Sequence, residues 1–207
     1  MANAIDKEQI EMLSEWWNDY GKTLVFAVAI GLLLGFGWRF WNSHETQNNQ
    51  QAAMVYSQLE NAAMAHDANV TTQLTSTLVS EYGKTAYASM ASLISARMAV
   101  EKNDLNAALM QTNWVVNNGS ADVFKQIARI NAARILLAQN KFDEALKELS
   151  ITNEKSLTPM VESVKGDIYR VSKQPELAKA AYQKAQTGYD AASVPAPLLK
   201  LLINMNN

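Results

Sequence analysis

The chain has 207 residues and a formal net charge of −2 at pH 7, and 48% of its residues are hydrophobic. It contains no cysteine, which excludes disulfides, thiol nucleophiles and thiolate metal sites. Beyond residue 41 the numbers of basic and acidic residues are equal. This balance argues against nucleic acid as a partner, because phosphate neutralisation needs a basic surface.

The first predicted segment, residues 1–21, is a short acidic tail. Its charged side chains are Asp6, Lys7, Glu8, Glu11, Glu15 and Asp19. A cleavable signal peptide begins instead with a short basic region. We therefore expect the tail to stay attached to the hydrophobic segment that follows it, and cleavage after that segment is the alternative.

The second segment is an uncharged run from Thr23 to Trp38, with Lys22 and Arg39 at its two ends. Its 16 residues cover roughly 24 Å as an α-helix, slightly less than a hydrocarbon core of about 30 Å. The flanking basic side chains can reach the headgroup layers, and aromatic residues cluster at both ends, as they do at membrane interfaces. We predict a single transmembrane helix over residues 22–41, and a buried core helix is the alternative.

The basic residues around this span predict its orientation. Lys7, Lys22 and the N-terminal amine precede the span, whereas only Arg39 follows it closely. Basic residues concentrate on the cytoplasmic side of membrane helices. We therefore expect a cytoplasmic N-terminus and a periplasmic or external location for residues 42–207.

Three small residues recur at every fourth position within the span, namely Ala27, Gly31 and Gly35. This spacing places them on one face of the helix, where small side chains let another helix approach closely. They are the candidate membrane-helix contacts of the chain. The alternative is that the glycines only reflect the ordinary composition of membrane helices.

Residues 42–207 are predicted to form one all-α domain. Glycine and proline are scarce there, and alanine-rich stretches have the three-to-four-residue spacing of helices. The segment also repeats: Ala96-Arg97, Asn103 and Ala108-Leu109 are matched 37 residues later by Ala133-Arg134, Asn140 and Ala145-Leu146. A third copy follows, in which Ala178 lies 33 residues after Ala145. Such periods are typical of stacked helix pairs.

The last copy has the spacing of a tetratricopeptide repeat. Its small and aromatic positions are Gly166, Tyr169, Ala178, Tyr182 and Ala185. A small residue in each copy is expected to let the first helix of a pair, helix A, lie close to the second, helix B. These residues are Ala96, Ala133 and Gly166. We therefore predict an α-solenoid of tetratricopeptide-like helix pairs.

Turns and ends fit this repeat frame. Breaks between helices A and B are predicted at residues 102–104, 139–141 and 173–175. Upstream, residues 51–65 and 70–82 are predicted to form a further helix pair. Downstream, the apolar segment 197–205 is predicted to be a C-terminal capping helix, because the end of a solenoid otherwise leaves an apolar face bare.

No residue pattern predicts catalysis. The histidines are His44 and His66, and neither has the neighbouring ligands of a metal site. The sequence has no Gly-x-Ser-x-Gly elbow and no glycine-rich phosphate-binding loop. We therefore expect a protein that is not an enzyme and that uses no cofactor or metal.

The remaining candidate site is the concave surface of the array, which the A helices line in tetratricopeptide proteins. Apolar side chains with arginine in each repeat suit an extended peptide or a partner's helix, and arginine pairs with carboxylates in a bidentate manner. The candidate protein-binding residues are Leu93, Arg97, Ile127, Ile130, Arg134, Leu137, Asp167 and Arg170, with Met90 and Met160 in the same frame. The alternative is that the next repeat buries these side chains and leaves no open groove.

Three features together resemble the YfgM family. They are Gly21-Lys22 before the span, the block GWRFWNSH from Gly37 to His44 after it, and a tetratricopeptide-like domain of this length. The resemblance implies a single-pass inner-membrane protein of Gram-negative bacteria with a cytoplasmic N-terminus and a periplasmic domain. It also implies an ancillary subunit of the SecYEG translocon that associates with the membrane-anchored periplasmic chaperone PpiD.

The resemblance therefore implies a protein–protein interaction scaffold that links the translocon to the periplasmic chaperone network during protein export. The expected partners are SecYEG, a PpiD-type chaperone, the membrane and translocating polypeptides. The alternative is a negative regulator of an envelope stress response, which binds a signalling protein through the acidic tail.

Overall fold

The computed structural model describes residues 17, 26, 30–33, 46–196 and 202–204. The predicted acidic tail apart from Trp17, most of the predicted span, and the candidate contacts Ala27 and Gly35 lie outside these residues. Phe26 and residues 30–33 are helical and exposed. Within the part of the chain that the structure describes, no helix combines the length and the apolar character that a membrane crossing requires.

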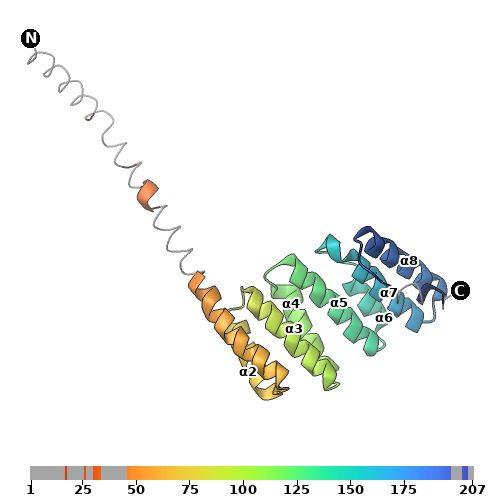
Figure 1. Cartoon of the computed structure of the whole chain (residues 1–207), viewed down its shortest axis with the longest axis horizontal. Coiled ribbons are helices and arrows are strands. Elements are labelled where there is room, and N and C mark those ends of the chain that lie inside the picture. The colour runs from red at the N-terminus through yellow and green to blue at the C-terminus, as the bar shows by residue number, and fades with distance from the viewer. Residues whose placement is uncertain (1–16, 18–25, 27–29, 34–45, 197–201, 205–207) are drawn as a thin grey trace, which may run out of the picture. The chain divides into compact units, whose positions relative to one another are not determined.

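Residues 46–196 fold into four pairs of helices (Figure 1). The first pair consists of the helix of residues 46–64 and α2 (Ala68–Glu81). The other pairs are α3 (Ala86–Glu101) with α4 (Leu105–Asn118), α5 (Asp122–Ala138) with α6 (Phe142–Glu148), and α7 (Thr158–Val171) with α8 (Pro175–Ala191). A short 3-10 helix, η1 (Lys155–Leu157), precedes α7. The predicted all-α class and the predicted helix pairs are confirmed.

The first helices of the pairs, which we call the A helices, lie next to one another along the array. α3 contacts α5, and α5 contacts α7. α4, the B helix of the second pair, packs against both α3 and α5. Each pair therefore contacts its neighbours in sequence, which is the packing of a repeat solenoid.

Three clusters of buried side chains hold the pairs together. The first joins the first pair to α3 and includes Leu59 and Leu78. The second joins α5, α6 and α7, and it includes Ile130 and Ile168. The third surrounds Tyr182 on α8. The hydrophobic core is therefore a series of local clusters, two of them between neighbouring pairs and one within the last pair.

The C-terminal end of the array is covered by residues of the predicted cap. Residues 202–204 are helical, and the remainder of the predicted capping helix lies outside the described residues. Leu202 and Ile203 pack against Ala178, Tyr182 and Ala185. These contacts bury an apolar face that the last pair would otherwise expose.

The three predicted breaks between helices A and B share one backbone geometry. Asn103, Asn140 and Lys173 adopt positive φ angles of 58°, 59° and 60°. In each turn the next residue donates its N–H to a carbonyl five residues earlier, as Asp104 does to Ala99 at 2.8 Å. This arrangement satisfies a terminal carbonyl of helix A. The sequence predicted the breaks but not the left-handed residue, because no glycine marks that position.

Side chains of α5 hold the longer connection between α6 and α7. The buried Gln126 accepts a hydrogen bond at Oε1 from the backbone N–H of Asn153, at 2.7 Å. Arg129 donates from Nε to Oδ1 of Asn153 at 3.0 Å, and from Nη1 to Oε2 of Glu148 at 2.9 Å. One turn of α5 thus fixes the segment that links two pairs.

Gly166 of α7 lies directly against the ring of Tyr182 of α8. A Cβ atom added to Gly166 would lie 2.4 Å from Cδ1 and from Cε1 of that ring, closer than real Cβ atoms come to any neighbour. Tyr182 is fully buried, so its ring has little room to move away. Ala96 and Ala133, at the equivalent positions, are buried as well. The predicted role of Gly166 between helices A and B is confirmed.

Replacing Gly166 with alanine is expected to lower the free energy of unfolding by up to about 2 kcal/mol. The clash with Tyr182 costs roughly 1–3 kcal/mol, and the higher helix propensity of alanine offsets about 1 kcal/mol of this. Urea unfolding followed by circular dichroism measures the change. In a Tyr182→Leu background, which lacks the ring, the penalty should shrink, and an equal penalty in both backgrounds would contradict the contact.

Candidate functional site

A cavity of about 310 Å³ lies between the A helices α3 and α5, and we call it the α3–α5 groove. Helix α4 supplies part of its wall. The lining residues are Leu93, Ala96, Arg97, Val100, Leu105, Thr112, Asn131, Arg134, Ile135 and Ala138. The α3 residues recur at three- and four-residue intervals, so they share one face of that helix.

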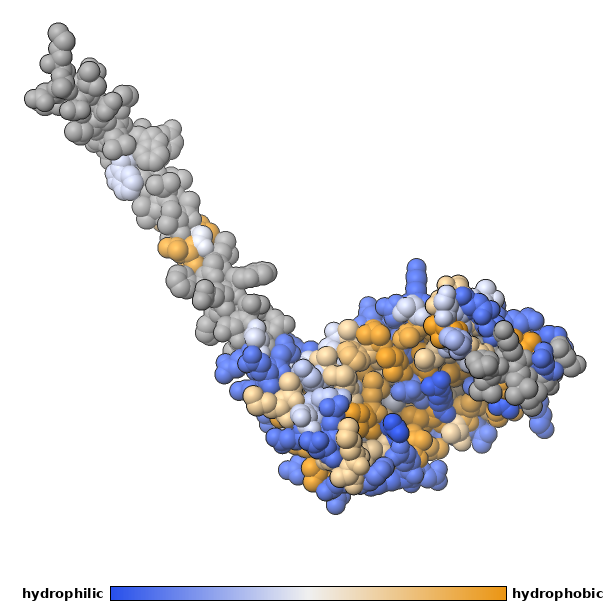
Figure 2. Space-filling model, in the orientation of Figure 1, coloured by the Kyte–Doolittle hydropathy of each residue, from blue (hydrophilic) through white to orange (hydrophobic). Residues whose placement is uncertain are grey.

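The lining of the α3–α5 groove is apolar and positively charged. Leu93, Val100 and Ile135 are among its apolar side chains, and its two charged residues are both arginines. Figure 2 shows hydrophobic residues gathered across the middle of the array, with hydrophilic residues toward its edges. Arg134 is exposed, and its guanidinium makes no ion pair or hydrogen bond with any described residue. The groove therefore presents an unpaired positive charge beside an apolar surface.

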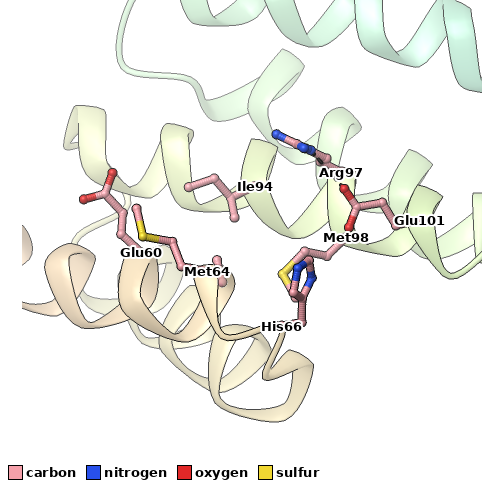
Figure 3. Close-up of a pocket in the computed structure, with 8 residues that line it drawn as sticks. Glu60, Met64, His66, Ile94, Arg97, Met98 and Glu101 are labelled. Carbon is pink, nitrogen blue, oxygen red and sulfur yellow. Dashed lines mark hydrogen bonds and ion pairs between the residues drawn. The ribbon is translucent and has the colours of Figure 1, made fainter.

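A second cavity, of about 300 Å³, lies between the helix of residues 46–64 and α3, and we call it the first-pair groove (Figure 3). Its lining residues are Glu60, Ala63, Met64, His66, Ile94, Arg97, Met98 and Glu101. Arg97 lines both grooves and donates from Nε to Oε1 of Glu101 at 3.0 Å. The Arg97 side chain is 81% exposed. An ion pair this exposed contributes little stability, so a partner's charge can replace it.

Tyr56 attaches the first helix to α3 next to the first-pair groove. Its ring packs against that of Tyr87, with centroids 5.4 Å apart and planes tilted by 45°. Burial, followed by the charge and the hydrogen bond of Glu60, raises the pKa of Tyr56 to about 12. Tyr56 therefore stays protonated well above neutral pH, and its hydroxyl group donates a hydrogen bond to the Glu60 carboxylate.

Histidine and carboxylate side chains also line the first-pair groove, with Glu60 at the far end from His66 (Figure 3). His66, Glu60 and Glu101 all line it. The described ranges nevertheless contain no group of three or more histidine, aspartate and glutamate side chains that could hold a metal ion. His44, the other histidine, lies outside those ranges.

The structure brings together some of the predicted concave-face residues and separates others. Leu93, Arg97 and Arg134 meet in the α3–α5 groove. Ile130 is only 1% exposed and packs in the cluster that α5 forms with α7, so it cannot contact a partner there. Leu137 packs against the same cluster. The assignment of Ile130 to an open face is therefore corrected, because the next pair covers it.

Ile127 and Met90 are half-buried and line neither groove, and Met160 packs against the cluster between α5 and α7. The repeat frame also missed residues that do line the grooves. Val100 lies three residues after Arg97, and this spacing alone would have placed it on the same face. Leu105 lies on α4, a B helix. The sequence prediction missed it because the candidate residues were taken from the A helices alone.

Asp167 and Arg170 both bind the hydroxyl group of Tyr182. Tyr182 donates to Oδ1 of Asp167 at 2.8 Å, and Nε of Arg170 donates to the Tyr182 oxygen at 3.3 Å. Burial is the largest cause that raises the pKa of Tyr182 to about 12, and the hydrogen bond to Asp167 adds to it. In this structure these two predicted site residues therefore join α7 to α8.

Comparison with known proteins now identifies the family. The family model described as a tetratricopeptide repeat-like domain matches residues 14–205. The chain is 30% identical to the ancillary SecYEG translocon subunit of Haemophilus influenzae, over 90% of this chain and 91% of that protein. The chain belongs to the family of ancillary SecYEG translocon subunits.

Further members of this family match along nearly their whole length. The ancillary SecYEG translocon subunit of Aggregatibacter actinomycetemcomitans is 27% identical over 99% of both chains. That of Escherichia coli is 24% identical over 96% of this chain and 95% of its own. The resemblance to the YfgM family is thereby confirmed, and the family is one of translocon subunits rather than of enzymes. No solved structure matched the chain significantly.

Replacing Tyr182 with phenylalanine is expected to reduce the loss of stability at high pH. The pKa of Tyr182 is about 12 in the folded chain, against an ordinary value of 10.0. Tyr182 loses its proton at a lower pH in the unfolded chain than in the folded chain. The stability that its protonated hydroxyl group contributes is therefore complete below about pH 10 and is lost as the pH rises toward about 12. Urea unfolding at about pH 8 and about pH 11 should show a larger decrease for the wild type than for Tyr182→Phe. Equal decreases would assign the effect to other groups.

Proposed function

We propose that this chain is an ancillary subunit of the SecYEG translocon in the bacterial inner membrane. Residues 22–41 anchor it, the N-terminal tail faces the cytoplasm, and the helix pairs face the periplasm. The array holds a PpiD-type membrane-anchored chaperone, or an emerging polypeptide, beside the translocon exit. The observation that carries this proposal is the similarity, over almost the entire length, to proteins named as ancillary SecYEG translocon subunits.

The two grooves support a protein-binding role for the array. Their volumes, about 300 Å³ and about 310 Å³, suit a few side chains of a partner segment. Met64 and Met98 line the first-pair groove, and flexible methionine side chains can adapt to more than one partner. The two grooves are adjacent, because Arg97 lines both of them, so one partner segment can contact both.

Photocrosslinking probes at Leu93 and Arg134 are expected to capture translocon or chaperone subunits in cells, because both positions line the α3–α5 groove. A probe at Lys147, an exposed residue of the B helix α6, is the matched control. Mass spectrometry identifies the adducts. Adducts with SecYEG or a PpiD-type chaperone support the scaffold, whereas adducts with many exported chains indicate a groove for unfolded substrate. Equal labelling from the control position would argue against a specific groove.

We further propose that Ala27, Gly31 and Gly35 form the face through which the span contacts another membrane helix. Gly31 is helical, and no atom of the described residues lies within 4 Å of a Cβ atom added to it. This space is available to a neighbouring helix. Small residues at four-residue spacing allow two helix backbones to approach closely.

Replacing both Gly31 and Gly35 with leucine is expected to reduce the amount of SecYEG that co-purifies with the chain several-fold, because the larger side chains keep the two helices apart. Leu33→Phe is the control, since a residue two positions away lies on the opposite face of the helix. Quantitative immunoblotting of the purified complex measures the change. Unchanged recovery in the double variant would remove the span from the interface.

A further inference from the structure

We propose that the α3–α5 groove recognises an apolar partner segment that carries a carboxylate, and that Arg134 pairs with this carboxylate. The inference rests on the proposed function, since it names the kind of segment that the array binds. Three observations support it. The groove is positively charged, Arg134 has no partner among the described residues, and apolar side chains line the same cavity.

The pairing of the arginines singles out Arg134. Four arginines lie in the described ranges, and three of them bind a side chain of this chain: Arg97 binds Glu101, Arg129 binds Glu148, and Arg170 binds Tyr182. Arg134 binds none of the described side chains. Its guanidinium is exposed and lines the cavity. A guanidinium in this position has all its donors available to a planar anionic group such as a carboxylate.

The groove adds an apolar requirement to this charge. Leu93, Val100, Leu105 and Ile135 line the same cavity as Arg134. A small free anion would leave these side chains in contact with water, whereas an aliphatic side chain of a protein segment would bury them. The groove therefore fits a segment in which a glutamate, an aspartate or a terminal carboxylate lies next to aliphatic residues.

The neighbouring groove has the opposite charge balance. No carboxylate lines the α3–α5 groove, whereas Glu60 and Glu101 line the first-pair groove with Arg97 as the arginine between them. A segment that crosses both grooves is therefore oriented, with its acidic residue toward α5 and any basic residue toward the first pair. Opposite charges on adjacent surfaces set the direction of binding in this way.

A peptide array tests the proposal on the full chain purified in detergent. The probes are short peptides rich in leucine, isoleucine and phenylalanine, in sets that differ only in one central residue, which is glutamate, glutamine or lysine. The glutamate peptides should bind about tenfold more tightly than their glutamine counterparts, because a hydrogen bond to a charged group contributes roughly this factor. The lysine peptides should bind most weakly.

Arg134→Glu is expected to reverse this preference, so that the lysine peptides bind more tightly than the glutamate peptides. Lys147→Glu makes the same charge change at an exposed position on α6 and should leave the preference for glutamate intact. Circular dichroism confirms that both variants are folded. Absence of binding by every set, absence of a preference for glutamate, or a preference that survives in Arg134→Glu would each overturn the proposal.

The peptide array and the cellular crosslinks test different claims: the array tests the preference for a carboxylate, and the crosslinks test the proposed partners. Crosslinks to the translocon without any preference for glutamate would overturn this inference and leave the proposed function standing. A preference for glutamate that depends on Arg134, without crosslinks to translocon or chaperone subunits, would uphold this inference and overturn the proposed partners.

Discussion

The close approach of helices A and B, through residues with little or no side chain, is the constraint on which the rest of the array depends. Ala108, Ala145 and Ala178 occupy equivalent repeat positions on α4, α6 and α8, and all three are 0% exposed. Larger side chains, such as that of Tyr182, fill the space that remains. With the pairs held this closely, successive A helices come into contact, and the C-terminal halves of α3 and α5 line the α3–α5 groove.

The framework of helix pairs was predictable because the same residue pattern recurs in successive repeats. The small residues and the turns recur at nearly the same spacing, so the regular copies show where the helices of an irregular copy lie. The hydrogen bonds by which Gln126 and Arg129 hold the connection between α6 and α7 were not predictable in this way. Their partner Asn153 is 27 and 24 residues away, and no local pattern links a buried glutamine to a distant backbone N–H.

The candidate site was harder to predict, because exposure on an A helix depends on the next pair. Ile130 and Arg134 are one turn apart on α5, so periodicity assigns both to the same face. Val164 and Ile168 of α7 pack in the same cluster as Ile130, whereas Arg134 remains exposed beside α3. Whether a face is open or covered is set by residues about thirty positions away, which a single helix pattern does not contain.

The short helix α6 makes local stability uneven along the array. It has 7 residues, against 14 in α4 and 17 in α8, and Ala145 is its one buried residue. In a solenoid each pair is supported mainly by its neighbours, so local unfolding starts at the weakest junction. Opening at α6 would expose the buried cluster that α5, α6 and α7 share, so α5 would lose part of its support. The integrity of the α3–α5 groove thus depends on α6, because α5 carries both Arg134, which lines the groove, and Ile130, which packs in that cluster.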